Sequence, residues 1–204
     1  MKRLTKTIMM LSPFSLAGVI WEPPLTEGMR EIREGNFDRA AEIFEDAAGG
    51  ELNQQEAVYG KALCYWFGIG VEQDKNRAVR LLEEDKMSPL NMEDGPEKQA
   101  AQHILGLYYM GQRGVKTRNK GIEYMREAAT GGHAASQFHL GCYYYRKYER
   151  GVGNTIGFQD NAMTLLTQAM ENPKLSKKCK NEAKEYLEKL PRKRVTEDDD
   201  FYKL

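Results

Sequence analysis

The chain has 204 residues, 41% of them hydrophobic and 29% charged, which suits one or two ordinary globular domains. Basic and acidic residues balance to a net charge of zero, so no overall charge draws the chain to nucleic acid or to a membrane surface. No apolar stretch reaches the roughly 18 residues needed to cross a bilayer. We therefore expect neither a nucleic-acid partner nor a stable membrane span.

The first 21 residues have the layout of a secretory signal peptide. Three basic residues and no acidic one precede an apolar run from Ile8 to Leu16, and Ser15-Leu16-Ala17 fits the small-residue rule for signal peptidase. We predict that Met1 to Ala17 are removed, that the mature chain begins near Gly18, and that the protein is periplasmic or secreted. A mitochondrial transit peptide, or a packed N-terminal helix of a cytoplasmic protein, is the alternative.

Beyond a linker at Glu22-Pro23-Pro24, one pattern is written several times. Residues 101–106 read AQHILG and residues 136–141 read SQFHLG, and each run continues into tyrosines. The two glycines, Gly106 and Gly141, are 35 residues apart, which is the length of one helix-turn-helix unit. A period in this range is typical of a helical solenoid.

The second helix of each unit repeats as well. A small residue opens it, an apolar pair follows three and four positions later, and alanine stands at the seventh position in three of four units. Because positions 0, 3, 4 and 7 share one face of an α-helix, this pattern predicts a buried stripe. The opening residues are Ala40, Ala78, Gly121 and Ala162.

Residues 57–74, 101–133 and 136–169 resemble the sel-1-like repeat, a relative of the tetratricopeptide repeat. Residues 26–48 look more like a plain tetratricopeptide unit, so the resemblance covers about residues 25–170. It implies an all-α, right-handed α-solenoid of about four helix-turn-helix repeats over residues 22–172. A charged amphipathic stretch at residues 173–190 predicts a C-terminal capping helix. We expect the charged tail, residues 191–204, to be disordered.

The charges are unevenly distributed along the predicted solenoid. Residues 22–97 hold 18 acidic and 8 basic residues, whereas residues 98–150 hold 3 acidic and 9 basic residues. Four of these cations crowd the loop predicted between the helices of the third unit: Arg113, Lys116, Arg118 and Lys120. These cations have two interpretations: they belong to a solvated loop, or they form a secondary surface that binds an acidic partner.

Motifs for catalysis, metal binding and cofactor binding are missing from the sequence. It has no phosphate-binding loop, no H-E-x-x-H, no C-x-x-C and no nucleophile elbow. The cysteines, Cys64, Cys142 and Cys179, are widely spaced, and we interpret them as small apolar residues. His103, His133 and His139 are interpreted as packing or surface residues. We predict no catalytic site, metal or cofactor.

The predicted binding surface is the concave face, which the first helices line in tetratricopeptide-like arrays. Residues three before, one after and four after the small residue of each first helix share one stripe, rich in the aromatic side chains that anchor interfaces. That stripe comprises Tyr59, Leu63, Trp66, His103, Leu107, Met110, Phe138, Cys142 and Tyr145, with Arg146 at its end. The tyrosines at the third position, Tyr65, Tyr109 and Tyr144, are expected in the core.

These features favour a non-enzymatic scaffold that holds a protein partner in its concave groove. By resemblance, it would be an exported bacterial adaptor or an immunity-type protein. A mitochondrial assembly factor, and a secreted enzyme acting on cell-wall-type small molecules, are the alternatives.

Overall fold

The computed structural model describes residues 27–48, 54–83, 89–91, 94–151 and 153–191. Within these ranges the chain is built from α-helices and one 3-10 turn, with no β-strand. The chain is an all-α solenoid, as predicted. The predicted signal peptide and nearly all of the predicted disordered tail lie outside the described residues.

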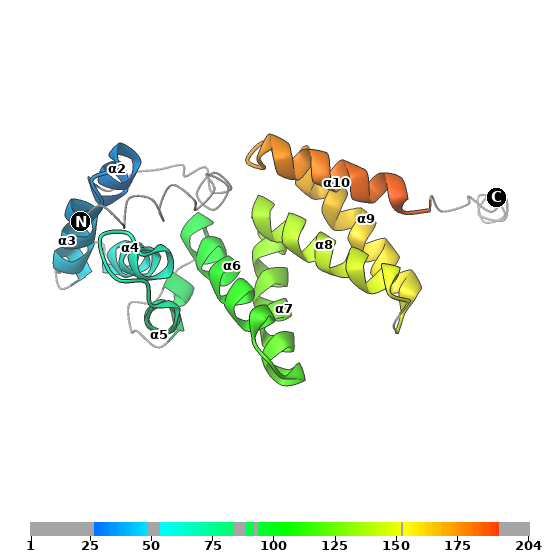
Figure 1. Ribbon diagram of the computed structural model, residues 1–204, viewed down its shortest axis with the longest axis horizontal. Helices are drawn as coiled ribbons and strands as arrows, with labels where there is room; N and C mark the ends of the chain where they lie inside the picture. Colours follow the sequence, from blue (N-terminus) through cyan, green and yellow to red (C-terminus); the bar gives the residue numbers. More distant parts are fainter. Residues whose placement is uncertain (1–26, 49–53, 84–88, 92–93, 152, 192–204) are drawn as a thin grey trace.

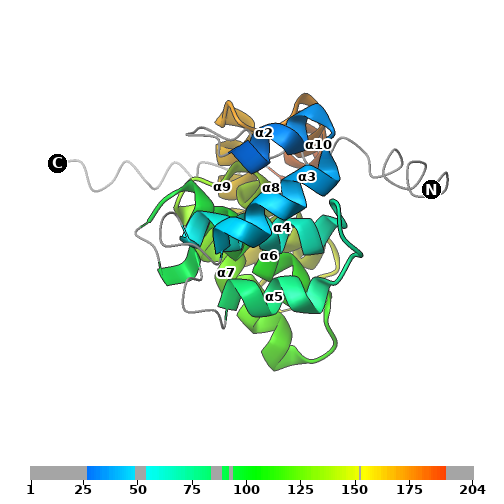
Figure 2. The same ribbon diagram turned by 90° about the vertical axis from the view of Figure 1, so that its left-hand side faces the viewer.

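Helices follow one another in antiparallel pairs along the long axis of the molecule (Figure 1). The pairs and the last helix are α2 (Glu27–Glu34) with α3 (Phe37–Ala48), α4 (Gln54–Phe67) with α5 (Lys75–Glu83), α6 (Pro96–Gly111) with α7 (Val115–Thr130), α8 (Ala134–Glu149) with α9 (Thr155–Glu171), and α10 (Lys177–Lys189). A 3-10 turn, Pro89–Asn91, precedes α6. Seen end on, the pairs stack behind one another (Figure 2).

Helix ends coincide with residues that satisfy free backbone groups. Asn154 accepts a hydrogen bond from the backbone N–H of Gly157 at 3.0 Å, and Ser176 accepts one from Cys179 at 3.3 Å, so both side chains cap helix N-termini. Between α4 and α5 the chain makes a tight turn in which Gly68 and Gly70 have φ angles of 72° and 65°, values that favour glycine. A side chain at Gly70 would also meet the carbonyl oxygen of Phe37 at 2.2 Å.

The core lies between the two helices of each pair and between neighbouring pairs. Ala40, Ala78, Gly121 and Ala162 lie within the second helices of their pairs, and all four are buried, as the repeat pattern predicts. In the third pair the backbones of α6 and α7 approach closely, since a Cβ atom on Gly121 would lie 2.5 Å from the backbone nitrogen of Met110. Small residues at these positions therefore set the spacing of the helices.

Two loops are shorter than the sequence indicated. The third unit's loop contains only Gln112 to Gly114, because α7 begins at Val115. We had expected Lys116, Arg118 and Lys120 to lie in a loop. They lie instead on the first turns of α7. The sequence of the fourth unit also predicts a long loop from Arg146 to Gln159. The loop between α8 and α9 spans only residues 150–154, because Arg146 is still helical.

Candidate functional site: two edges of the solenoid

Most of the predicted binding stripe is not on an open surface. On α4, Tyr59, Leu63 and Trp66 are all buried, and they pack in one cluster with residues of α6. The Trp66 ring lies 6.5 Å, centroid to centroid, from the Tyr108 ring of α6. The expectation of exposure was wrong here because this face of α4 turns toward the next unit of the solenoid.

The stripe on α8 is also buried, for a different reason. Phe138 and Cys142 pack in a cluster with α9 and with α10. Tyr145 lies 4.5 Å, centroid to centroid, from Tyr186 of α10. The predicted capping helix therefore covers the surface that had been assigned to a partner. Arg146 at the end of the stripe remains exposed.

Apart from Arg146, only the α6 residues leave part of the stripe open. His103 is buried and Met110 is half-buried, whereas Leu107 is 36% exposed. One exposed leucine is ordinary for a soluble protein and does not define a binding surface.

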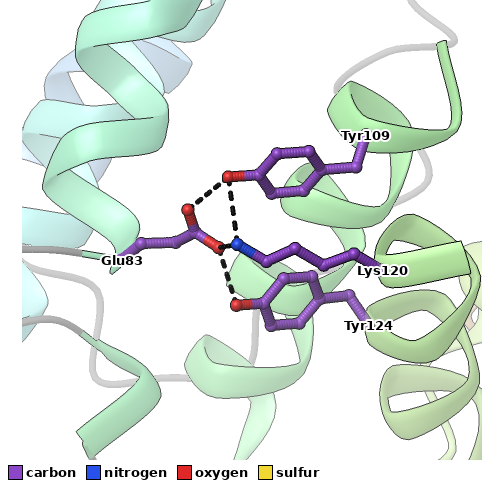
Figure 3. Close-up of polar contacts among 4 residues, drawn as sticks. All are labelled: Glu83, Tyr109, Lys120 and Tyr124. Carbon is purple, nitrogen blue, oxygen red and sulfur yellow. Dashed lines mark hydrogen bonds and ion pairs between the residues drawn. The ribbon is translucent and has the colours of Figure 1, made fainter. Parts of the chain in front are cut away.

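A polar network joins the second unit to the third (Figure 3). The Glu83 carboxylate at the end of α5 accepts hydrogen bonds from the hydroxyls of Tyr109 and Tyr124, the latter at 2.7 Å. The ammonium group of Lys120 pairs with Glu83 at 2.7 Å and lies 4.4 Å from the centre of the Tyr109 ring. Lys120, predicted to belong to a free basic loop, is therefore held inside a link between units.

The network holds each of its groups in its ordinary protonation state near neutral pH. Burial alone would raise the pKa of Glu83, but the hydrogen bonds from Lys120, Tyr109 and Tyr124 keep it below its usual value. Burial, followed by the hydrogen bond to Glu83, raises the pKa of both Tyr109 and Tyr124. These shifts suit a structural link and not a proton-transferring acid or base, whose pKa would lie near the working pH.

The remaining cations form a surface that we call the basic edge: Arg113, Lys116, Arg118 and Lys147. The first three are exposed around the start of α7, and none of the four is in an ion pair with a residue that the structure describes. Lys147 of α8 lies 5.7 Å from the centre of the Tyr143 ring. Burial raises the pKa of Tyr143, and the charge of Arg118 opposes this rise.

An apolar side chain lies among these cations. Val115, the first residue of α7, is 73% exposed. No acidic residue occupies the first turn of α7, although carboxylates are the side chains that stabilise a helix N-terminus. The N-terminus of α7 carries a positive partial charge, as do the side chains of Lys116 and Arg118, so the local potential is positive.

At the other end of α7, roughly 24 Å away by helix length, the surface is hollowed. Two adjoining hollows, of about 680 and 640 Å³, share Gln99 and Gly131. We call them together the polar groove. Five carboxamide side chains line it: Gln99, Gln102, Gln137, Gln168 and Asn172. No such groove was predicted, although Gln102 and Gln137 occupy equivalent positions of the repeated sequence.

The three histidines converge, which the sequence reasoning missed. The His103 ring lies 4.8 Å from the His133 ring and 5.4 Å from the His139 ring, centroid to centroid. Ser136 Oγ lies 2.8 Å from Nδ1 of His103 and 2.9 Å from Nδ1 of His133. The only available signal was that His103 and His139 take nearly equivalent places in successive units. Within the described ranges no three His, Cys, Asp or Glu side chains are arranged to hold a metal ion.

The cysteines behave as predicted. Cys64 and Cys142 are buried and unpaired, and burial raises the pKa of each thiol to about 12. Both thiols therefore stay protonated and unreactive at neutral pH. Cys142 packs within the core and offers no contact to a partner.

The stacked helix pairs and their period define a protein of the α-solenoid class. The Sel1 repeat family model matches residues 55–84 and 99–133, so the chain contains two Sel1 repeats. No curated protein matches the chain. Sel1 repeats generally mediate protein–protein interaction and form non-catalytic scaffolds. In the described part, no helix is both long and apolar enough to cross a membrane.

Proposed function

We propose that this chain is a non-enzymatic scaffold that binds an acidic segment of a protein partner at its basic edge. The observation that carries the proposal is the presence of three exposed cations, Arg113, Lys116 and Arg118, beside the exposed Val115, with no ion-pair partner among the described residues. Lys120 differs from these cations, because it lies close to them in sequence but forms an ion pair with Glu83 of the preceding unit.

The energetics of the basic edge favour an anionic partner. Like charges near a helix N-terminus are unfavourable, and a carboxylate bound there would relieve this repulsion. Lys116 and Arg118 supply long-range attraction and rapid association, and Val115 supplies apolar area that becomes buried on binding. The surface is at the exposed end of a rigid helix pair, so binding requires no rearrangement of the core.

The same proposal includes export. The basic and then apolar N-terminus supports removal of Met1 to Ala17. The adaptor or immunity-type role in the bacterial envelope rests on the resemblance to sel-1-like proteins alone. N-terminal sequencing of the protein from its native compartment should give a start near Gly18. Recovery of the intact Met1 would contradict export by this route and leave the basic edge untouched.

Charge reversal tests the basic edge. In the triple variant R113E/K116E/R118E, affinity for the partner isolated with the wild-type chain should fall by about tenfold or more, mainly through slower association. The wild-type affinity should also weaken as salt rises, since exposed charges are screened beyond about 8 Å at 0.15 M ionic strength. Surface plasmon resonance at two salt concentrations measures both effects.

A matched control makes the same change in net charge elsewhere. Arg33, Arg80 and Lys177 are exposed on α2, α5 and α10, so R33E/R80E/K177E should retain the affinity of the wild type. Equal losses in the two triple variants would mean that the attraction is a general effect of charge. No loss in R113E/K116E/R118E would remove the basic edge as the binding surface.

A further inference from the structure

The polar groove has a floor of carboxamides whose hydrogen bonds are already made. Asn172 donates to the carbonyl oxygen of Gly132 at 2.9 Å and to the side-chain oxygen of Gln137 at 3.3 Å. Gln137 in turn donates to the carbonyl oxygen of Ala129 at 3.2 Å, and Gln102 donates to Glu127 at 2.7 Å. These contacts fix the floor across the third and fourth units.

Two further carboxamides stand over this floor without such partners. Gln99 and Gln168 make no side-chain hydrogen bond to a described residue. The Gln99 carboxamide lies against Gly131, since a Cβ atom added to that glycine would be 2.6 Å from Gln99 Nε2. A glycine at this position therefore makes room for a carboxamide that is free to bind.

The charges of the groove balance, so an ion is not the ligand that fits it best. Its lining holds Asp94, Glu127 and Glu171 against Lys98, Arg126 and Lys174. Lys98 and Asp94 form an ion pair with each other at 2.9 Å. A neutral ligand with alternating donors and acceptors matches such a lining, because each carboxamide offers both a donor and an acceptor.

From these contacts we infer that the polar groove binds the main chain of an extended polypeptide segment, with Gln99 and Gln168 hydrogen-bonded to its peptide groups. A carboxamide pairs with a peptide group through one N–H and one C=O, independently of the side chain. Among the residues that the structure describes, the lining contains no aromatic side chain on which a sugar ring would stack. The groove lies at the opposite end of α7 from the basic edge, so this binding does not depend on the proposed function.

The test uses a displayed library of random peptides of about 12 residues, selected on the full-length R113E/K116E/R118E variant so that peptides bound by the basic edge are not enriched. Binding of the enriched peptides is then compared between the wild type and Q99A/Q168A, whose substituted side chains are only partly buried or exposed. We expect a loss of about tenfold or more in affinity, with unchanged helical circular dichroism. N-methylation of the peptide backbone should weaken binding to the wild type by a similar factor, because it removes main-chain donors.

Two further variants test whether the enriched peptides occupy the polar groove and not the basic edge. R113E/K116E/R118E should bind them as the wild type does, whereas G131A, which displaces the Gln99 carboxamide, should bind them several-fold more weakly. The inference is overturned if no peptide is enriched, or if enriched peptides bind Q99A/Q168A with full affinity. It is also overturned if an oligosaccharide of N-acetylglucosamine competes for Gln99 and Gln168 while peptides do not.

Discussion

Replacing Gly121 by leucine is expected to lower the free energy of unfolding by about 3 kcal/mol or more. A Cβ atom at this position would lie 2.5 Å from the backbone nitrogen of Met110 and 2.9 Å from the backbone carbon of Tyr109. Both are main-chain atoms of α6, so they cannot turn aside as the tip of a side chain can. The pair α6–α7 must separate, which opens the core around Met125 and disturbs the network on Glu83.

The equivalent change at Gly106 or Gly141 should cost less, about 1–3 kcal/mol. Added atoms there first meet the ends of flexible side chains, Met125 and Leu166, each at 2.9 Å. Gly111 is the matched control, because it lies at the exposed end of α6 with open space around it. In thermal unfolding, the melting temperature of Gly121→Leu should therefore be lower than that of Gly106→Leu, and the melting temperature of G111L should be close to that of the wild type. Equal melting temperatures for G121L and G111L would contradict the close approach of α6 and α7.

The solenoid could be predicted from the sequence because its signal is local and repeated. Small residues such as Ala40 and Gly121 recur at one helical position and are followed by apolar pairs at a fixed spacing. Because the same pattern recurs in every unit, a unit with an irregular sequence can still be assigned from its neighbours. Loop lengths were less predictable, because Lys116 and Arg118 are poor N-terminal helix residues that tertiary packing nevertheless places on α7.

The binding surface could not be predicted with the same success. A stripe of aromatic residues on a first helix has the same helical spacing whether it faces a partner, the next unit or a capping helix. Trp66 faces α6 and Tyr145 faces α10, and both contacts depend on the three-dimensional stacking of units. The polar groove was missed because its residues come from helix ends far apart in sequence, such as Gln99 and Gln168.

The second large effect is expected on acidification, and it arises from the hydrogen bonds of Ser136. The backbone N–H of Ser136 donates to Nδ1 of His133 at 3.3 Å, so this nitrogen is an acceptor and caps α8. The Ser136 hydroxyl then donates to the same nitrogen and accepts from Nδ1–H of His103. The His133 imidazole must be neutral for this arrangement, because protonating its Nδ1 breaks the cap, whereas the Nδ1–H donor of His103 is present in either protonation state.

Burial, the largest cause, lowers the pKa of His103 well below its usual value. For His103 the charges of His133 and His139 act in the same direction. Burial also lowers the pKa of His133 to about 4, with help from His139 and Lys174. In the unfolded chain both side chains bind a proton near pH 6.5. Between about pH 6.5 and 4 the unfolded state therefore holds more protons than the folded state, and stability falls as the pH falls.

As the pH falls through that window, each histidine that stays neutral in the folded state should lower the free energy of unfolding by about 1.4 kcal/mol per pH unit. For His133 the loss should reach about 3 kcal/mol by pH 4. Urea unfolding followed at several pH values should show constant stability above about pH 7 and a steady decline below it. The informative variant is His133→Asn, because asparagine can still cap α8 but takes up no proton. The decline should become shallower by the contribution of one proton in H133N. If H133N loses stability with pH as steeply as the wild type, His133 is not neutral in the folded chain, and the hydrogen-bond assignment around Ser136 is wrong.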